Sequence, residues 1–449
     1  MEKINIVSSQ DSGENHVSIG IEIGNDQSIL WSASIRQKLS ERSNPSLGTT
    51  SCIYRVHQRI RKMNEDSYTP DMVSIGPYHR GRDKLQAMED HKLQYVQSLL
   101  DRTRDRITLE KYVEALKELE PKARGFYSEP ISLSSKEFVE MMLFDGFFLI
   151  ELFRKNFNVV EVDDNDPIFY SNSRRARVVG DLVLVENQIP ILVLQTLFDL
   201  SKDPNQDFQP LIKMALFYFH TLIPEAVHKY PQNNKNITHN HLLDLLCYTL
   251  DSSLPKVTKP RLSTTAHSLP CVSELRCAGV KFKKGHRSSS LIHIKFKEGV
   301  FEIPPLCIDD YTDSFFRNLI AYEQYRFDGA HYITSFAILM DYLINSDEDV
   351  AFLRGREIIK NHLGHDNKVS FLFSHLCSEV SNTDFYYSEL CDEVNEYYSQ
   401  RSNKWNATLK RDYCNSPWTI ISVIAAIVLL FLTAWGTVFT TLQVFNVHA

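Results

Sequence analysis

The segment that most constrains the fold of this 449-residue chain lies near its C-terminus. Residues 418–439 are 22 consecutive positions without a charged side chain, and a helix of that length spans about 33 Å. The apolar core of a bilayer is about 30 Å thick, so the segment predicts a transmembrane helix that includes Trp418, Leu430 and Phe439. A buried core helix is the competing interpretation, which the length, terminal position and missing charge disfavour. Trp418 and Trp435 suit the two membrane interfaces, where tryptophan is enriched.

The charges that flank this segment predict its orientation. Four basic residues precede it and are offset mainly by Asp412: Arg401, Lys404, Lys410 and Arg411. No lysine or arginine follows it in residues 440–449, and positive charge favours the cytoplasmic side of a membrane. We therefore expect a cytosolic N-terminal domain and a lumenal or extracellular tail, with the glycosylation sequons at Asn236 and Asn406 unmodified. The charges do not distinguish the plasma membrane from an endomembrane.

The N-terminal sequence differs from a signal peptide. It contains acidic residues and lacks both an apolar run and a small-residue cleavage site. Because the apolar segment comes so late in the chain, we expect a single-pass, tail-anchored protein that inserts after translation.

The composition of the whole chain is that of a folded protein. Apolar residues make up 43% and charged residues 23%, close to the average. The formal charge of −7 argues against a nucleic-acid-binding protein, which needs an excess of lysine and arginine. Eight cysteines with no CxxC pair indicate reduced and mostly buried thiols. We expect Cys247, Cys307 and Cys377 to be free.

Helical periodicity dominates the chain. Residues 137–153 are apolar on nearly all sides and follow a possible capping box of Ser134 and Glu137. Residues 178–200 are similar, with an interruption at the sequence VENQIP (185–190). These two segments are expected to form the most buried helices, with five side chains inside: Phe138, Met142, Phe148, Leu184 and Leu192.

Two further helices are marked by their ends. Asp83 and Gln86 resemble a second capping box, which would begin a helix. Residues 108–120 form an amphipathic pattern that Pro121 is expected to end.

Beyond residue 271 the period shifts towards two, which predicts a small antiparallel hairpin or three-stranded sheet around a turn at Glu298 and Gly299. The fold class we predict is mainly α: a multi-helix globular domain with a small antiparallel β element and a single C-terminal transmembrane helix. The expected parts are a flexible arm (1–30), a mainly helical core region (31–253), a linker or long loop (254–270), the β element (271–310), a C-terminal helical region of the same globular unit (311–413), the transmembrane anchor (414–440) and a short tail (441–449).

Known catalytic patterns are missing from the sequence. It contains no GxGxxG, P-loop, HExxH, GxSxG or kinase motif. The closest histidine pairs lack clustered cysteine or carboxylate partners and are weak candidates for zinc: His239 with His241, and His362 with His365. Packing explains Cys271 and Cys277 better than a redox or metal role. We therefore assign no catalytic, cofactor-binding or metal-binding residue and expect no cofactor.

Two carboxylates stand inside apolar segments, Asp145 and Glu186. A buried carboxylate is costly without a donor, so each is either an acid with a raised pKa in a pocket or a structural hydrogen-bond hub. We favour the hub. The basic runs at 174–177 and 281–287 could contact anionic lipid or an acidic partner, although a solvated surface is the default interpretation.

Several motifs together resemble a plant family known as domain of unknown function 247. They are CIYRVHQRIRKMNEDSYTPDMVSIGPYHRG (52–81), LQAMEDHK (85–92), EFVEMMLFDGFFLIELF (137–153), DLVLVENQIP (181–190), AGVKFKKG (278–285), FEIPPLCID (301–309), LIAYEQY (319–325), EVNEYY (393–398) and WNATLKRDY (405–413). The resemblance covers residues 31–440. It implies a plant-specific, mainly helical protein with one C-terminal span and no family-wide enzymatic activity or cofactor. Some grass members are implicated in pollen self-incompatibility, which suggests recognition or signalling.

The residue types in these motifs suit an architectural role. Gly76, Pro77 and Gly81 predict a turn before a helix. Asn187 and Gln188 are expected to satisfy backbone groups where Pro190 interrupts the helices.

The sequence favours a non-enzymatic, membrane-tethered interaction or signalling protein, with the lipid bilayer and an unknown protein as partners and no nucleic acid. The alternative is an uncharacterised enzyme that uses His79 with Asp71 or Glu89 as a general acid–base pair. The enzyme should place His79 in a concave pocket with a shifted carboxylate and a nucleophile or metal. Packing of His79 in the interior would remove this candidate.

Overall fold

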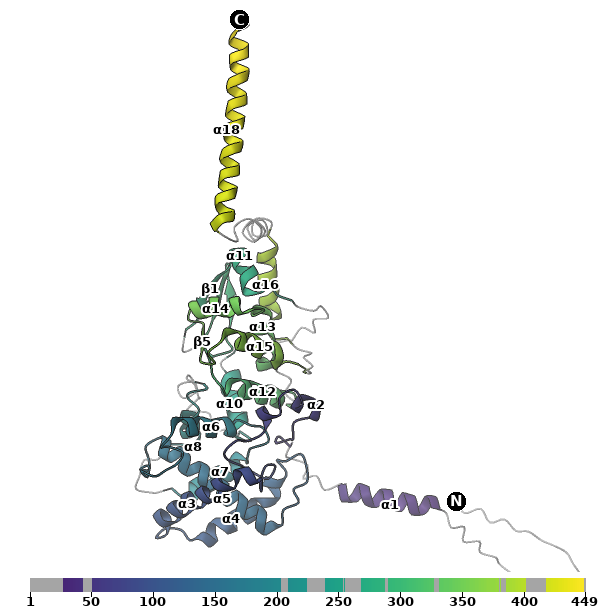
Figure 1. The fold of residues 1–449 in the computed structure, drawn as a ribbon. Helices are drawn as coiled ribbons and strands as arrows, with labels where there is room; N and C mark the ends of the chain where they lie inside the picture. The colour runs from purple at the N-terminus through teal and green to yellow at the C-terminus, as the bar shows by residue number, and fades with distance from the viewer. Residues whose placement is uncertain are drawn as a thin grey trace, which may run out of the picture. The chain divides into compact units, whose positions relative to one another are not determined.

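The computed structural model describes residues 27–42, 51–202, 209–223, 239–252, 254, 268–286, 290–326, 331–378, 380, 385–400 and 417–447. The chain divides into two compact units, Met1–Gly48 and Thr49–Ala449. The first contains the helix α1 (Gln27–Arg42), on which Leu30, Trp31 and Ile35 are exposed (Figure 1). Most of the predicted arm (1–30) and of the predicted linker (254–270) lies outside the described residues.

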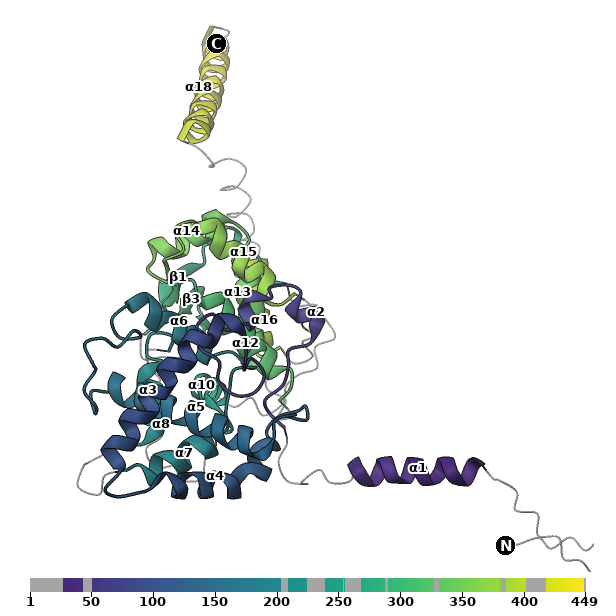
Figure 2. The same ribbon diagram turned by 60° about the horizontal axis from the view of Figure 1, so that its bottom comes forward.

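A five-helix layer forms one half of the second unit. The helix α5 (Ser135–Asn156) lies at its centre (Figure 2). Four helices pack around α5: α3 (Gln86–Thr103), α4 (Leu109–Arg124), α7 (Ile191–Leu200) and α8 (Leu211–Tyr218). A helix that is apolar on nearly all sides gains most from being enclosed in this way.

The start of α5 is the predicted capping box. The Ser134 hydroxyl accepts a hydrogen bond from the Glu137 N–H, and the Glu137 carboxylate accepts one from the Ser134 N–H at 2.8 Å. Two of the unpaired N–H groups at the helix start are thereby satisfied.

Four of the five predicted core side chains are confirmed. Their exposed fractions are 2% or less: Phe138, Met142, Phe148 and Leu184. The prediction is wrong for Leu192, which is only half-buried. The helix α7 begins at Ile191, and this register turns Val193 and Leu194 inward in its place.

Two predicted helix ends are wrong. Asp83 does not cap α3, because Asp83–Leu85 forms a short 3-10 turn (η2) and no side chain caps the helix. Pro121 does not end α4, which continues to Arg124. Pro121 lies in the last turn, where Arg124 donates to the carbonyls of Ile131 and Leu133 and holds the next segment against the helix end.

The other half of the second unit contains further helices, and one continuous hydrophobic core joins it to the first half. Its helices are α10 (Leu242–Asp251), α11 (Val272–Cys277), α12 (Thr312–Glu323), α13 (Tyr332–Leu343), α14 (Asp347–Gly355), α15 (Asp366–Leu376) and α16 (Ser388–Ser399). The remaining short elements are α2 (Gln58–Arg61), the 3-10 turn η1 (Asp66–Tyr68), which packs on α12, and α6 (Asn172–Leu182).

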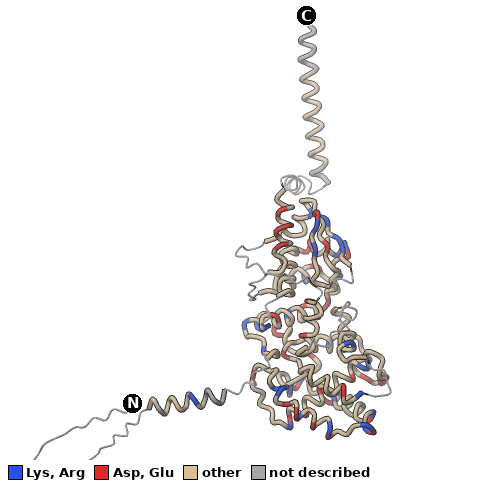
Figure 3. Tube along the Cα trace, turned by 180° about the vertical axis from the view of Figure 1, so that it is seen from behind, with Lys and Arg blue, Asp and Glu red and all other residues tan. Residues whose placement is uncertain are grey.

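The main sheet has the strand order β1-β3-β2, with β1 (Lys281–Lys284), β2 (Lys295–Lys297) and β3 (Val300–Ile303). The predicted hairpin is confirmed for β2 and β3, which pair antiparallel around Glu298 and Gly299, both with positive φ. The antiparallel prediction is wrong for β1, which pairs parallel to β3. Because β2 lies at the outer edge of the sheet, β1 pairs with β3 and not with β2, and β1 and β3 run in the same direction. These strands are rich in lysine, and Figure 3 shows basic positions, in blue, gathered on one side of the part of the unit that contains the sheet.

A second, two-stranded parallel sheet pairs β4 (Leu306–Ile308) with β5 (Ile359–Asn361). This sheet was not predicted, because three-residue strands are too short for an alternating pattern to show in the sequence.

The C-terminal helix α18 (Pro417–Val447) is 31 residues long. Within the part of the chain that the structure describes, no helix combines the length and the apolar character needed to cross a membrane. The Leu430 side chain is 68% exposed, whereas the Trp418 and Phe439 side chains lie outside the described residues. The mainly helical fold class is thus confirmed, and the membrane anchor stays a prediction.

The predicted free thiols are confirmed at Cys247, Cys307 and Cys377. Cys307 is exposed, contrary to the general expectation of burial.

Candidate functional site

Four of the motif segments meet in the interior of the second unit. Six polar side chains with at most 4% exposure lie there, and we call them the polar junction: His79, Lys92, Asp145, Asp181, Glu186 and Asn187. They come from the loop before α3, from α3, α5 and α6, and from the VENQIP turn between α6 and α7. Each is held by hydrogen bonds or charges of other elements.

Glu186 links the VENQIP turn to the segment that contains Val56 and Arg61. Its carboxylate accepts a hydrogen bond from the Val56 N–H at 2.6 Å and another from the Arg61 guanidinium. Nε2 of His79 lies 3.4 Å from the second carboxylate oxygen. Burial alone would raise the pKa of Glu186, but His79, Arg61 and the Val56 N–H hold it below its usual value. Glu186 is therefore an ionised anchor, as the hub hypothesis expects.

His79 is fully buried, and this burial lowers its pKa, against the pull of Glu186. It contacts neither of the carboxylates that the enzyme hypothesis paired with it. Asp71 pairs with Arg177 at 3.1 Å on the surface, and Glu89 pairs with Lys92 at 2.7 Å. The imidazole is enclosed with Glu186 as its charged neighbour.

Asp145 holds the turn at Gly76. Its carboxylate accepts from the Gly76 N–H at 2.7 Å and from the Lys92 ammonium at 2.6 Å. Lys92 also donates to the Ser74 carbonyl. The φ of Gly76 is +76°, and an added Cβ would lie 2.5 Å from the Gln188 carbonyl oxygen. The predicted turn therefore needs glycine both for its backbone conformation and for its space.

Asp181 binds the backbone just before this turn. Its carboxylate accepts hydrogen bonds of 2.7–2.8 Å from three consecutive N–H groups, those of Asp71, Met72 and Val73. Burial raises its pKa to about 6, although the three donors favour the ionised form. Asp181 was not predicted from the sequence, because its partners lie more than 100 positions away. Its place at the start of the DLVLVENQIP motif was the only available sign.

Asn187 and Gln188 act as predicted. Asn187 accepts from the Ile75 N–H at 2.7 Å and donates to the Val73 carbonyl at 3.0 Å. Gln188 donates to the carbonyls of Leu182 and Leu184 at 2.8 and 2.9 Å, where the helix α6 has ended. Both amides therefore satisfy backbone groups that regular structure leaves free.

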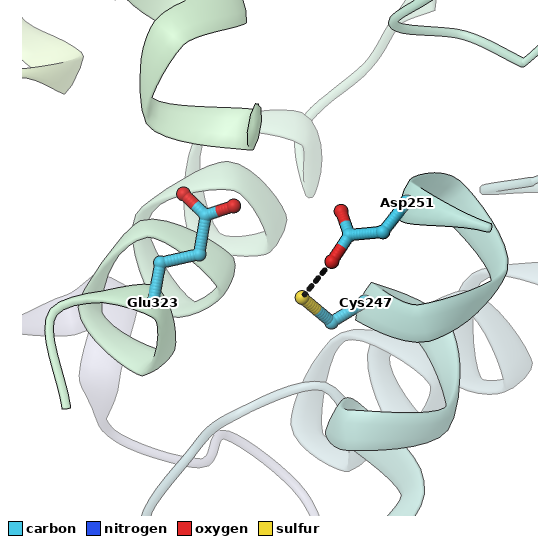
Figure 4. A group of neighbouring side chains, drawn as sticks. All are labelled: Cys247, Asp251 and Glu323. Carbon is cyan, nitrogen blue, oxygen red and sulfur yellow. Dashed lines mark hydrogen bonds between the residues drawn. The ribbon is translucent and has the colours of Figure 1, made fainter. Parts of the chain in front are cut away.

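A second buried cluster joins α10 to α12 (Figure 4). The ligand atoms of Cys247, Asp251 and Glu323 lie within 4.8 Å of one another, which is close enough to hold a metal ion. This cluster was not predicted from the sequence, where the four-residue spacing of Cys247 and Asp251 on one helix face was its only sign.

The charges of this second cluster are already compensated. Arg326 donates to the Cys247 sulfur at 2.9 Å and to the Asp251 carboxylate at 2.8 Å. Glu323 accepts from the N–H groups of Ile333 and Thr334 at 2.8 Å, and burial together with Asp251 raises its pKa to about 8. A divalent cation would have to displace the Arg326 guanidinium, so the arrangement suits a polar link between α10, α12 and α13.

The weak histidine pairs do not form a shared site. His241 caps α10 by accepting from the Asp244 N–H at 3.2 Å, and His239 packs against the Tyr248 ring. His362 lies 3.7 Å from the Cys307 sulfur, whereas His365 stands at the start of α15.

A hollow of about 530 Å³ lies between α13 and α15 and is lined by residues that include Asp341, Phe371 and Ser374. The Ser374 Oγ lies 2.8 Å from Nδ1 of His375, and burial raises the pKa of Asp341. Ser374 and His375 both also bond the Phe371 carbonyl of their own helix. Such bonds are common for these residues in helices and show no activated nucleophile.

The sequence pattern of a plant family of unknown function, DUF247, matches residues 53–432. The chain belongs to this family. It is 32% identical over 420 residues to a UPF0481 protein of Arabidopsis thaliana, with 88% of this chain and 87% of the relative covered. It is 23% identical over 477 residues to a putative UPF0481 protein of the same plant, with 86% and 89% covered. No solved structure matches the chain. The polar junction lies wholly within the DUF247 match.

Proposed function

We propose that this DUF247 protein is a non-enzymatic interaction or signalling protein that a C-terminal helix tethers to a membrane. One observation carries the non-enzymatic part. The interior side chains of the motif segments that could do chemistry, His79, Asp145, Asp181 and Glu186, are at most 4% exposed. Asp145, Asp181 and Glu186 each accept hydrogen bonds from loop N–H groups, which leaves them little capacity to bind a substrate.

The tether is supported by the sequence and by α18. Residues 418–439 carry no charge. Large apolar side chains of α18 are more than half exposed at the described positions Ile424, Leu430 and Trp435. Such a helix in water would leave a large apolar surface uncovered, and a bilayer would cover it.

The membrane association is tested with the full chain in plant microsomes. We expect the protein to stay in the pellet after alkaline carbonate washing. In the matched variant Ile427→Asp/Leu430→Asp, two charges at the middle of the helix each disfavour insertion by about 3 kcal/mol, and we expect this variant in the supernatant. Recovery of the wild type and the variant in the same fraction after carbonate washing would refute the tether through α18.

The orientation is tested in the same membranes. We expect a sequon appended after Ala449 to be glycosylated and the sequons at Asn236 and Asn406 to stay unmodified. Protease added to intact microsomes should digest the N-terminal domain. A glycan on Asn236, or protection of that domain, would show the opposite orientation.

The alternative function is that of an uncharacterised enzyme. The sequence suggested His79 as its general acid or base. The burial of His79 against Glu186 gives this hypothesis little support. A hydroxyl and an imidazole, those of Ser374 and His375, are paired beside the hollow between α13 and α15. A fluorophosphonate probe tests it: we expect no labelling of the full chain, whereas labelling that Ser374→Ala abolishes and Ser370→Ala retains would identify a hydrolase.

A further inference from the structure

The main sheet has one aromatic face, which is covered. The register places Phe282, Phe301 and Phe296 side by side across β1, β3 and β2. Phe282 also meets Phe352 of α14, and Phe296 meets Tyr397 of α16, each with ring centroids 5.8 Å apart. Because side chains alternate along a strand, the residues on either side of each phenylalanine point to the opposite face.

Four lysines occupy that opposite face, and we call them the lysine face: Lys281, Lys283, Lys295 and Lys297. Lys283 and Lys295 flank Glu302 in one row, while Lys281 and Lys297 flank Val300 in the next. All four lysines are exposed. Among the residues that the structure describes, none of the four ammonium groups takes part in an ion pair or a side-chain hydrogen bond. Glu302 is the single acidic residue in these two rows, so the face is strongly positive.

The lysine face belongs to the folded region that immediately precedes α18 in the chain. The helix α16 packs against β2 and ends at Ser399. Residues 400–416 then lead to Pro417, at the start of α18, and 17 residues can span at most about 60 Å. This segment adds four basic residues and one acidic residue. If α18 is in a membrane, the lysine face is held within this reach of the bilayer surface, at high local concentration.

We propose that the lysine face docks on anionic lipid headgroups of the leaflet to which α18 is tethered. This inference rests on the proposed membrane tether. An anionic leaflet attracts each nearby lysine by about 1 kcal/mol, which is about a fivefold gain in occupancy per lysine. The face is a regular array of flexible point charges, and Val300 is the only apolar side chain between them. Protein partners are usually held by buried aromatic or arginine anchors, and single-stranded nucleic acids by exposed aromatics, and these two rows contain neither.

The full chain in lipid nanodiscs tests the proposal. Lysines are labelled with an amine-reactive reagent and quantified by mass spectrometry, in phosphatidylcholine alone and with about one-third phosphatidylserine. We expect labelling of the four face lysines to slow by about fivefold or more in the anionic discs, and the protection to disappear at about 0.5 M salt, where exposed charges are screened. The exposed Lys111 and Lys117 of α4 are internal controls and should label equally in both lipids.

A pair of matched variants sharpens the test. Lys283→Gln/Lys295→Gln should restore fast labelling of Lys281 and Lys297 in anionic discs, whereas Lys111→Gln/Lys117→Gln should not. Equal labelling in both lipids, by a chain that resists carbonate extraction, would overturn the docking but leave the tether intact. A chain that carbonate extracts would refute the tether itself. If added polyglutamate slowed the labelling of the four face lysines in neutral discs and phosphatidylserine did not, the proposal of lipid docking would be overturned. The partner of the lysine face would then be an acidic protein.

Discussion

The Lys92 ammonium lies 2.6 Å from the Asp145 carboxylate, and each side chain is only 2% exposed. The two residues are 53 positions apart and join α3 to α5. Because a buried charge is stable only with its partner, this pair also fixes the loop whose Ser74 carbonyl and Gly76 N–H it binds. The loop, α3 and α5 thus share one electrostatic connection in the interior.

Breaking this pair should be strongly destabilising. Lys92→Met leaves Asp145 charged and buried without its cation, and we expect a loss of about 3–5 kcal/mol in the free energy of unfolding. Lys92→Met/Asp145→Asn should lose less than the sum of the two single variants, since neither charge then remains. Urea unfolding followed by circular dichroism measures the cycle. Arg177→Met, in the exposed pair with Asp71, is the control and should lose less than about 1 kcal/mol.

The two glycines of the turn before α3 separate the effect of backbone conformation from that of space. Gly76 and Gly81 have φ of +76° and +78°, but an added Cβ meets the Gln188 carbonyl only at Gly76. We expect Gly81→Ala to cost about 1–2 kcal/mol for the left-handed backbone alone. Gly76→Ala should cost about 1–3 kcal/mol more, because the neighbouring backbone must move. Equal thermal stability of the two variants would show that space at Gly76 is not limiting.

The centre of the helical core is tested at Phe148. Its side chain is fully buried and packs on the Tyr95 ring with a centroid distance of 5.1 Å. We expect Phe148→Ala to lower the free energy of unfolding by about 3–5 kcal/mol. Phe371→Ala is the matched control, because Phe371 is 63% exposed, and it should change stability by about 0.5 kcal/mol or less. Similar effects of both substitutions would contradict the assigned core.

His241 should make the fold sensitive to mild acid. Burial lowers its pKa from 6.5 to about 4, so the unfolded chain takes up a proton at a higher pH than the folded chain does. The neutral ring therefore contributes stability above pH 6.5, and this contribution of about 3 kcal/mol is lost as the pH falls towards 4.

The raised pKa values of Asp181 and Glu323 act in the opposite direction, so the wild type is compared with a variant. His241→Asn keeps an acceptor at the helix start and removes the titration. The stability difference between the two proteins should shrink by about 1–2 kcal/mol between pH 7 and pH 5. A difference that is the same at both pH values would show that His241 does not titrate in this way.

Local features of this chain could be predicted from the sequence because their partners are close along it. Ser134 and Glu137 are three positions apart, and their capping box formed as expected. The apolar pattern of residues 137–153 correctly predicted a buried helix, because a helix with apolar side chains on nearly every face must be enclosed to remove them from water. Asn187 and Gln188 bind carbonyls beside the interruption at Pro190, which the sequence itself marks.

Only the tertiary structure decided which distant groups meet. The parallel pairing of β1 with β3 depends on a crossover whose path no local pattern encodes. Asp181 finds its three N–H donors 108 to 110 positions away, and Glu323 lies beside Cys247 and Asp251 only because α10 and α12 pack together. The sequence determined the helices, their buried faces and the lysines of the β segments, because periodicity and charge are properties of neighbouring residues. Packing decided which donors each buried acid binds and which face of the sheet exposes its lysines to solvent. The reason is that the free energy of a buried charge depends on groups brought to it from elsewhere in the chain.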